Sequence, residues 1–271
     1  MDQYQVLGNP IKHSKSPAIH KVFADQTAQD MQYSAQLVAE DNFEAYVQEF
    51  FDKGGKGLNI TVPFKQRAFA LAKHPSAAAS LAEAANTLWV NADGELCADN
   101  TDGVGMVRDI TANLAGSLAG KRVLILGAGG AVRGVLEPVL AQNPSELVIA
   151  NRTVSKAQDL AEAVQHLGKV SACGFTQVTG QFDWIINGTS ASLSGDLPPL
   201  PAGILAQGAR TYDMMYGAEP TVFSQWAKQQ GAAQADDGLG MLVEQAAEAF
   251  TIWRGVRPQT QQLLADLRAQ L

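Results

Sequence analysis

The sequence predicts an α/β fold with two domains. Short runs of β-branched and other apolar residues alternate with longer stretches of helical periodicity, a pattern typical of βαβ units and a parallel sheet. The 271 residues suffice for two medium-sized domains at about 150 residues each. A change of character after Asp102 separates a first part with polar strand ends from a more regular run of strands and helices.

In the first hundred residues we expect strands and helices in alternation. Ser16 is expected to cap the first helix, with Pro17 in its first turn. An alanine-rich stretch, 77–85, also indicates a helix. The expected strands are 4–7, 32–38, 57–60, 87–90 and 95–97, and the helices expected besides the alanine-rich one are 17–26, 43–51 and 64–72.

From residue 103 the alternation is more regular. A helix is expected at 104–118, followed by strands at 123–126, 147–150, 184–186 and 211–213, with a helix after each of the first two. After Gly238 the periodicity is purely helical, with a break at Arg257 and Pro258. We therefore predict one domain over 1–102, a second over 103–237, and C-terminal helices over 238–271 that return to the first domain.

Composition excludes several functions. The formal net charge of −7 leaves no basic field to neutralise the phosphates of nucleic acid or anionic lipid. The N-terminus lacks the apolar run of a secretory signal, and no stretch reaches the roughly eighteen consecutive apolar residues of a membrane span. The 2 cysteines and 4 histidines show neither a disulfide framework nor metal-ligand spacing. We expect a cytoplasmic protein that binds no nucleic acid, membrane or metal.

A glycine-rich turn is the strongest chemical signal in the sequence. The apolar strand 123–126 runs into it, and a helix follows from Ala131 to Gln142. Glycines let the backbone approach a pyrophosphate, and the free N–H groups of a helix N-terminus bind its charge. The turn therefore predicts a Rossmann-like dinucleotide-binding domain, with a tight turn that holds no ligand as the alternative. The usual third glycine is replaced by Val132, and the residues expected at the pyrophosphate are Gly127, Ala128, Gly129, Gly130 and Ala131.

The end of the next strand indicates which dinucleotide binds. An NAD site usually places an acidic residue there to bind the ribose hydroxyls. This chain instead has Asn151, Arg152 and Thr153, with Lys156 one turn further on. A guanidinium forms paired hydrogen bonds with a phosphate, so the pattern favours NADP, with Arg152 binding its 2′-phosphate. The alternative is that Arg152 is a solvated surface residue without a ligand.

Three polar clusters in the first part lie beside expected strands. They are Asn59 to Lys65 at a strand end, Asn86-Thr87 at a strand start, and Asn100 to Gly103 at the domain border. Open α/β folds bind ligands at such an edge of the sheet. Each cluster alone is equally consistent with turns and helix caps, which use the same residue types.

Taken together, these motifs give the chain a specific resemblance. It resembles the shikimate dehydrogenase family over essentially its whole length, with the family's motifs in the same order and spacing. Beyond the three polar clusters, the motifs that carry the resemblance are Gly8-Asn9-Pro10, His13-Ser14-Lys15-Ser16-Pro17, Gly127 to Ala131, Asn151-Arg152-Thr153, Asn187-Gly188-Thr189-Ser190, Tyr212-Asp213-Met214, Tyr216 and Gly238 to Gln245. Two positions depart from the pattern: Lys156 stands where many members have arginine, and Glu83 where a small residue, usually glycine, precedes Asn86.

The resemblance implies the reversible NADPH-dependent reduction of 3-dehydroshikimate to shikimate, a step of aromatic amino-acid biosynthesis. It implies Lys65 and Asp102 as the catalytic pair. The implied substrate ligands are Ser14 and Ser16 for the carboxylate, Asn59, Thr61, Asn86 and Gln245 for the ring hydroxyls, and Tyr216. The implied cofactor ligands beyond the two motifs above are Met214 and Gly238 beside the nicotinamide, and Thr189 and Ser190 in a neighbouring loop.

The chemistry agrees with these residue types. Hydride delivery to a ketone leaves negative charge on oxygen, so a proton donor must stand within hydrogen-bond reach. Lys65 can donate that proton or stabilise the alkoxide. Residues 1–102 then form the substrate-binding domain and 103–237 the NADP-binding domain, with the active site in the cleft between them and domain closure expected.

Two other functions fit parts of the pattern. A quinate/shikimate dehydrogenase of broader specificity often uses NAD, against which Arg152 and the lack of an acidic strand end argue. A non-catalytic NADP-sensing regulator would have a broken catalytic pair, whereas Lys65 and Asp102 are both present. The expected partner is a small-molecule substrate, and the expected state is a monomer or a homodimer.

Overall fold

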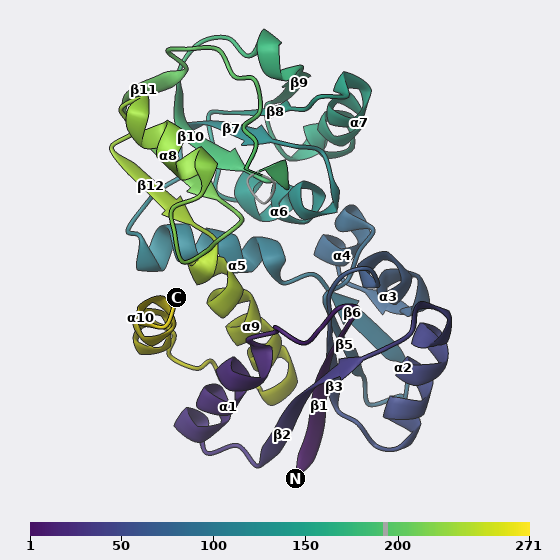
Figure 1. The fold of residues 1–271 in the computed structure, drawn as a ribbon. Helices are drawn as coiled ribbons and strands as arrows, with labels where there is room; N and C mark the ends of the chain where they lie inside the picture. Colours follow the sequence, from purple (N-terminus) through teal and green to yellow (C-terminus); the bar gives the residue numbers. More distant parts are fainter. Residues whose placement is uncertain (192–194) are drawn as a thin grey trace. The chain divides into compact units, whose positions relative to one another are not determined.

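The computed structural model describes residues 1–191 and 195–271. The chain divides into two compact units, each built on a six-stranded sheet (Figure 1). Unit 1 contains residues 1–105 and 243–266, and unit 2 contains residues 106–242 and 267–271. This is the expected α/β fold with two domains. The C-terminal helical segment is shared, since residues 238–242 and 267–271 group with unit 2.

Unit 1 contains a mixed sheet with strand order β2-β1-β3-β5-β6-β4. Its strands are β1 (Asp2–Gly8), β2 (Met31–Leu37), β3 (Gly57–Ile60), β4 (His74–Pro75), β5 (Thr87–Val90) and β6 (Leu96–Asp99). The helices wholly within it are α1 (Ser16–Thr27), α2 (Phe43–Asp52), α3 (Lys65–Leu71) and α4 (Ala77–Ala82). Three further helices contribute residues to both units: α5 (Asp102–Arg108), α9 (Leu239–Arg254) and α10 (Gln261–Ala269).

The expectation of parallel strands is wrong for part of unit 1. Strand β5 runs antiparallel to both β3 and β6. Only residues 91–95 join β5 to β6, whereas a parallel crossover needs about a dozen residues or more. As a result the start of β5 lies at the same edge of the sheet as the ends of β3 and β6, with Thr87 opposite both Asn59 and Asp99.

Helices cover both faces of the unit 1 sheet (Figure 1). On the face covered by α2 and α3, Leu58 and Ile60 belong to a buried core that includes the stacked rings of Phe43 and Phe64. The other face is covered by α1 and the unit 1 part of α9. There the backbone of β3 comes so close to α9 that a Cβ on Gly57 would lie 2.5 Å from the Trp253 ring. This close approach places the start of β3 next to Trp253 of α9.

Unit 2 contains a wholly parallel sheet with strand order β12-β11-β10-β7-β8-β9. Its strands are β7 (Arg122–Leu126), β8 (Glu146–Ala150), β9 (Val170–Cys173), β10 (Phe182–Asn187), β11 (Leu205–Asp213) and β12 (Gln234–Asp237). Its helices include α6 (Gly130–Leu140), α7 (Val154–Val164) and α8 (Val222–Gln229). The strand order reverses between β7 and β10, and such a switch point opens a crevice at the carboxyl ends of the strands.

The helix expected at 104–118 is shorter in the structure. It ends at Arg108 and continues as a π-helical turn over Asp109–Asn113. Beyond this turn, tertiary hydrogen bonds replace helical ones, because Arg210 Nη2 donates to the Leu114 carbonyl and Trp184 Nε1 to the Ser117 carbonyl. In the described ranges, no helix is both long and apolar enough to cross a membrane.

Candidate active site

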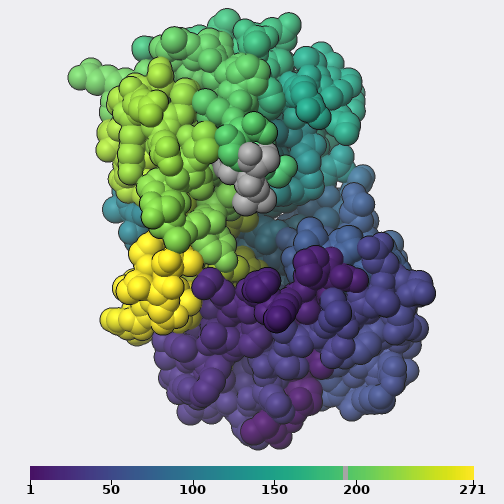
Figure 2. Space-filling view, in the orientation of Figure 1, coloured from purple at the N-terminus to yellow at the C-terminus, as the bar shows by residue number. Residues whose placement is uncertain are grey.

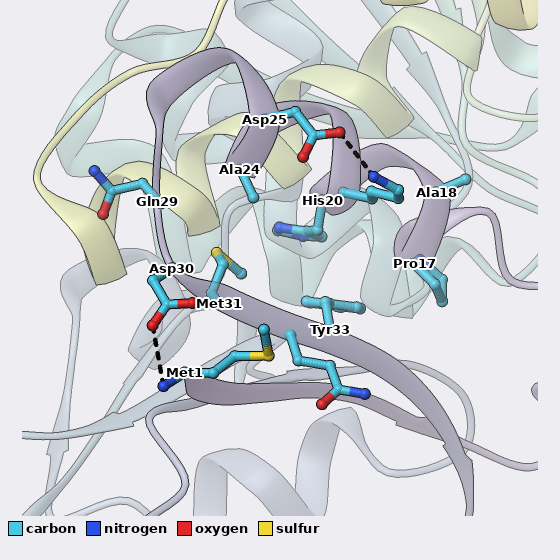
Figure 3. A pocket seen from close by; sticks show the side chains of 12 residues that line it. Met1, Pro17, Ala18, His20, Ala24, Asp25, Gln29, Asp30, Met31 and Tyr33 are labelled. Atoms are coloured by element: carbon cyan, nitrogen blue, oxygen red, sulfur yellow. Dashed lines mark hydrogen bonds and ion pairs between the residues drawn. The ribbon is translucent and has the colours of Figure 1, made fainter.

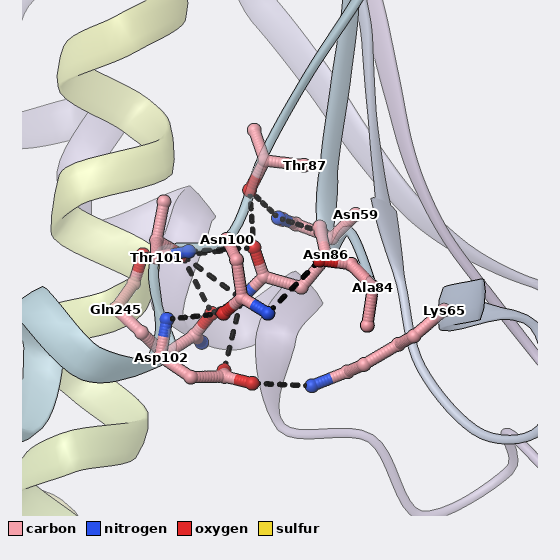
Figure 4. A network of polar contacts seen from close by, with 9 residues as sticks. All are labelled: Asn59, Lys65, Ala84, Asn86, Thr87, Asn100, Thr101, Asp102 and Gln245. Carbon is pink, nitrogen blue, oxygen red and sulfur yellow. Dashed lines mark hydrogen bonds and ion pairs between the residues drawn. The ribbon is translucent and has the colours of Figure 1, made fainter. Parts of the chain in front are cut away.

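Lys65 and Asp102 form an ion pair in unit 1 (Figure 4). The distance from Lys65 Nζ to Asp102 Oδ2 is 2.6 Å, and the two side chains are 30% and 15% exposed. Each is the first residue of a helix, α3 and α5 respectively, that starts shortly after a strand ends. The structure therefore brings together the two residues predicted as the catalytic pair, with an ammonium group that solvent still reaches.

Asn86 binds the second oxygen of the same carboxylate. Its Nδ2 donates to Asp102 Oδ1 at 2.9 Å and to Thr101 Oγ1 at 3.0 Å. Its Oδ1 accepts from the Thr101 backbone N–H and from Thr87 Oγ1, both at 2.9 Å. Since the Asn86 side chain is buried and bonded at both ends of its amide, it fixes the plane of the Asp102 carboxylate.

Helix α9 adds Gln245 to this network. Gln245 Oε1 lies 3.3 Å from Asn86 Nδ2, and Thr101 Oγ1 donates to the Gln245 backbone carbonyl at 3.0 Å. Gly105 allows the close approach of α5 to α9, because a Cβ there would lie 2.6 Å from the Gln245 nitrogen. Gln245 is thus hydrogen-bonded to the network that holds the predicted catalytic pair.

Asn59 joins the network from β3 through both ends of its amide. Its Nδ2 donates to the Asn86 carbonyl at 3.1 Å and to Thr87 Oγ1 at 3.2 Å. Its Oδ1 accepts from the Tyr33 hydroxyl at 2.7 Å. Sequence reasoning assigned no role to Tyr33, which no motif marks, and none to Thr101, although Thr101 lies within a motif.

Ser14 and Ser16 lie where the chain leaves β1 and enters α1. Ser16 is the first residue of α1 rather than its cap, because Lys15 already has helical dihedral angles, so that expectation is wrong. The Ser16 N–H instead donates to Ser14 Oγ at 3.3 Å, which brings the two predicted carboxylate ligands together. The segment after β1 lies on the surface of unit 1, in dark purple in Figure 2. Thr61 follows β3, and its methyl group lies 2.5 Å from where a Cβ on Gly8 would be.

The glycine-rich turn of unit 2 lies at the switch point of the sheet. Gly127 has a φ of +108°, which a residue with a side chain rarely adopts. A Cβ on Gly129 or Gly130 would meet no atom within 4 Å, so the space over the first turn of α6 is open. Val132, in place of the usual third glycine, is accommodated by Gly188, whose Cβ would lie 2.4 Å from the valine Cγ2. The remaining turn residues, Ala128 and Ala131, flank this opening.

The loop after β8 carries the predicted phosphate ligands. Arg152, Thr153 and Lys156 are exposed, and Asn151 Nδ2 donates to the Thr153 carbonyl at 2.9 Å, which stabilises the turn into α7. Within residues 1–191 and 195–271, neither cation takes part in an ion pair. Both therefore remain available to an anionic ligand.

The loops after β10 and β11 are tied together by a buried carboxylate. Asp213 accepts from Asn187 Nδ2 at 3.0 Å and from the Thr221 hydroxyl at 2.6 Å, and Asn187 Oδ1 accepts from Thr189 Oγ1 at 2.8 Å. Ser190 follows this loop and is exposed. The network fixes the loop that carries Thr189 beside the glycine-rich turn.

The residues on either side of the predicted nicotinamide position are also close together. A Cβ on Gly238 would lie 2.3 Å from the Met214 carbonyl oxygen, so only glycine fits there. Tyr216, two residues beyond Met214, is half-buried, and burial followed by the nearby charge of Asp237 raises its pKa. The open glycine turn, the unpaired cations and these loops thus fit a dinucleotide with a 2′-phosphate. No three His, Cys, Asp or Glu side chains of the described ranges could together hold a metal ion.

Comparisons with known proteins agree with this geometry. The family described as the shikimate dehydrogenase substrate binding domain matches residues 6–88, the shikimate / quinate 5-dehydrogenase family matches 109–194, and the shikimate 5′-dehydrogenase C-terminal domain matches 238–267. The protein named shikimate dehydrogenase (NADP(+)) of Cellvibrio japonicus is 59% identical over 271 residues, which cover 100% of this chain and 98% of that protein.

Solved structures are similar over the whole chain as well. An Ael1 enzyme from Pseudomonas putida has a TM-score of 0.95 and 51% identity, with 98% of each chain covered. The shikimate 5-dehydrogenase of Thermus thermophilus, in complex with NADP(H) and shikimate, has a TM-score of 0.87 and 29% identity, with 100% of each chain covered. On these similarities and its site geometry, the chain belongs to the shikimate dehydrogenase family.

Proposed function

We propose that this chain is an NADP-dependent oxidoreductase that interconverts 3-dehydroshikimate and shikimate. The observation that carries the proposal is the Lys65–Asp102 pair, 2.6 Å apart, with the second carboxylate oxygen held by Asn86. Bound NADPH supplies the hydride to the ketone carbon. The chain must then supply a proton to the oxygen that carries the developing charge, and the Lys65 ammonium is placed to do so.

The other groups of unit 1 bind and orient the substrate. Asp102 accepts a hydrogen bond from the reacting hydroxyl while it keeps the Lys65 ammonium in place. Gln245 offers an amide group to the ring hydroxyls, Asn86 contacts them beside its bond to Asp102, and Asn59 Oδ1 keeps a second acceptor position beside its bond from Tyr33. Four further residues bind the substrate in this proposal. Ser14 and Ser16 bind its carboxylate, Thr61 binds a ring hydroxyl, and Tyr216 also contacts the substrate.

Unit 2 holds the cofactor in this proposal. Gly127, Gly129 and Gly130, with Ala128 and Ala131, present backbone N–H groups and the N-terminus of α6 to the pyrophosphate. The 2′-phosphate is bound by four residues of the loop after β8: Asn151, Arg152, Thr153 and Lys156. Close to the nicotinamide are four others: Thr189, Ser190, Met214 and Gly238. Residues 1–102 are thereby proposed as the substrate-binding domain and 103–237 as the NADP-binding domain. Residues 238–271 add Gln245 to the substrate ligands and Gly238 to the cofactor ligands.

Two further properties belong to the proposal. The formal net charge of −7 supports small molecules, rather than nucleic acid, as the ligands. We also propose that the chain acts as a monomer or a homodimer, which analytical ultracentrifugation of the purified chain tests.

Nicotinamide reduction, followed by absorbance, tests the function directly. Shikimate and quinate are each offered with NADP and with NAD. The proposal predicts strong turnover only for shikimate with NADP. Comparable turnover with quinate or NAD would instead indicate a dehydrogenase of broader specificity, and no turnover from a folded, NADP-binding protein would indicate a non-catalytic sensor.

A further inference from the structure

Tyr33 lies at one end of a hydrogen-bonded chain of side chains that crosses the unit 1 sheet. It is on the edge strand β2, opposite Tyr4 of β1, which in turn is opposite Gly57 of β3. Alternate residues of a strand share a face, so Asn59 points to the same side as Gly57. The Tyr33 hydroxyl reaches across β1 to Asn59 Oδ1 at 2.7 Å.

The Tyr33 ring is fixed by a buried histidine (Figure 3). The His20 ring, from α1, stacks on it with the two centroids 4.1 Å apart and an angle of 6° between the ring planes. His20 is fully buried, and neither ring nitrogen has a hydrogen-bond partner among the described residues. Burial lowers the pKa of His20 to about 3, although the neighbouring Asn59 raises this pKa by a smaller amount. The imidazole is therefore neutral, and its contact with Tyr33 is through the flat face of the ring.

The order of hydrogen bonds beyond Tyr33 leads to the catalytic pair (Figure 4). Since Asn59 Oδ1 accepts from Tyr33, the amide is oriented with Nδ2 toward Thr87 Oγ1, at 3.2 Å. Thr87 in turn donates to Asn86 Oδ1 at 2.9 Å, and Asn86 donates to Asp102. Without the Tyr33 hydroxyl, Asn59 Oδ1 loses this hydrogen bond, while Nδ2 keeps its bond to the Asn86 carbonyl at 3.1 Å.

The Tyr33 hydroxyl keeps its proton. Burial raises the pKa of Tyr33 well above its ordinary value, so the phenol stays neutral and donates to Asn59 Oδ1. Tyr33 thus acts as a hydrogen-bond donor to Asn59, one of the predicted substrate ligands.

We propose that Tyr33 is a positioning residue of the substrate site, which sets the Asn59 amide and is itself held by the stacked His20 ring. This inference rests on the proposed function, because it assigns a role in binding shikimate. Its hydroxyl acts through Asn59, so its loss affects the substrate rather than the cofactor.

The Tyr33→Phe variant removes only the hydroxyl and keeps the stacked ring. We expect the KM for shikimate to rise by about three- to tenfold, the effect of one lost hydrogen bond, while the KM for NADP is unchanged. The matched control is Tyr46→Phe, since the Tyr46 hydroxyl donates to Gln5 Oε1 at 2.9 Å away from this network. A merely structural role would lower the Tm of both variants without a selective change in the shikimate KM. Equal shikimate KM values for the two variants would overturn the proposal.

A double-mutant cycle with Asn59→Ala separates this inference from the proposed function. If Tyr33 acts through Asn59, Tyr33→Phe has less effect on the free energy of unfolding, and on the shikimate KM, when Asn59 is already alanine. Strictly additive effects on unfolding would contradict the coupling, whether or not the enzyme turns over shikimate. Failure of the wild type to oxidise shikimate, with coupling intact in unfolding, would overturn the substrate-site role together with the proposed function.

Discussion

Asn86 Nδ2 lies 2.9 Å from Asp102 Oδ1, and this bond turns the other carboxylate oxygen toward Lys65. Asn86 comes directly before β5, and Asp102 follows β6, the next strand along the chain. The two meet because β5 is antiparallel to its neighbours, so the residue before its start lies at the same edge as the ends of β3 and β6. The β5–β6 hairpin thus positions Asn86 and Asp102 next to each other in the proposed active site.

Replacing Asn86 by alanine should damage both stability and activity. The change removes the partners of the Thr101 N–H and of Asp102 Oδ1, so we expect the free energy of unfolding to fall by about 1–3 kcal/mol. We expect kcat/KM for shikimate to fall at least about tenfold, because the carboxylate is no longer oriented. Urea titration and steady-state kinetics measure the two effects. Asn42→Ala, at an exposed position without a side-chain cap, is the control, and equal behaviour of the two variants would refute the role of Asn86.

Arg152 is expected to distinguish NADP from NAD. In the Arg152→Ala variant the KM for NADP should rise about 10- to 100-fold, the loss expected for hydrogen bonds to a charged group, while the KM for NAD changes little. The control is Lys169→Ala, which removes an exposed cation that pairs with Glu146 at 3.1 Å at the other end of β8. An equal loss with both cofactors would show that Arg152 does not bind the 2′-phosphate.

Glu83 should be replaceable by glycine with a gain in stability. It ends α4 in the left-handed conformation, with a φ of +50°, which costs a residue with a side chain about 1 kcal/mol relative to glycine. Glu83→Gly is therefore expected to raise the free energy of unfolding by up to about 1 kcal/mol and to leave kcat unchanged. Ala72→Gly, which ends α3 with a φ of −75°, should lower it instead. A loss of stability in Glu83→Gly would mean that the contacts of the glutamate outweigh the backbone strain.

Buried His20 should make the protein sensitive to acid. Its pKa is lowered by burial from 6.5 to about 3, so below pH 6.5 the unfolded chain binds a proton that the native chain does not. Stability is therefore lost as the pH falls from 6.5 toward 3, at about 1.4 kcal/mol per pH unit. Between pH 6.5 and 4.5 the wild type should lose about 2–3 kcal/mol more than a His20→Phe variant in chemical unfolding. Parallel losses would indicate that His20 becomes protonated without unfolding.

Periodicity predicted most of the regular elements, and some of the elements it missed depend on neighbours. The apolar run from Val123, which leads into a glycine-rich turn, predicts a strand, and the structure places it in β7. Strand β12 has the sequence Gln-Ala-Asp-Asp, without a β-branched residue, and it is extended because it pairs with β11. The antiparallel direction of β5 likewise follows from the short link to β6. The prediction of parallel strands, made from the alternation of strands and helices, did not take the length of this link into account.

In the site, too, the local sequence marks some residues, and others can be found only from tertiary contacts. Lys65, Asn86 and Asp102 lie in polar clusters next to strands, so the sequence marks them as candidates. Tyr33 carries no such mark, because its bond to Asn59 spans 26 residues and depends on the strand order β2-β1-β3. His20 could be assigned to packing from its lack of ligand spacing, but not to the ring of Tyr33.

In the proposed mechanism the Lys65 ammonium, paired with Asp102, serves the reacting oxygen. The most direct measurement is kcat for shikimate oxidation with NADP by the Lys65→Met variant, which keeps much of the side chain's length and removes its charge. Lys21→Met is the matched control, because Lys21 forms an exposed pair with Asp25 on α1. The mechanism predicts that kcat falls at least about 100-fold for Lys65→Met and stays near the wild-type value for Lys21→Met. A kcat within about threefold of wild type for a folded Lys65→Met enzyme would contradict it.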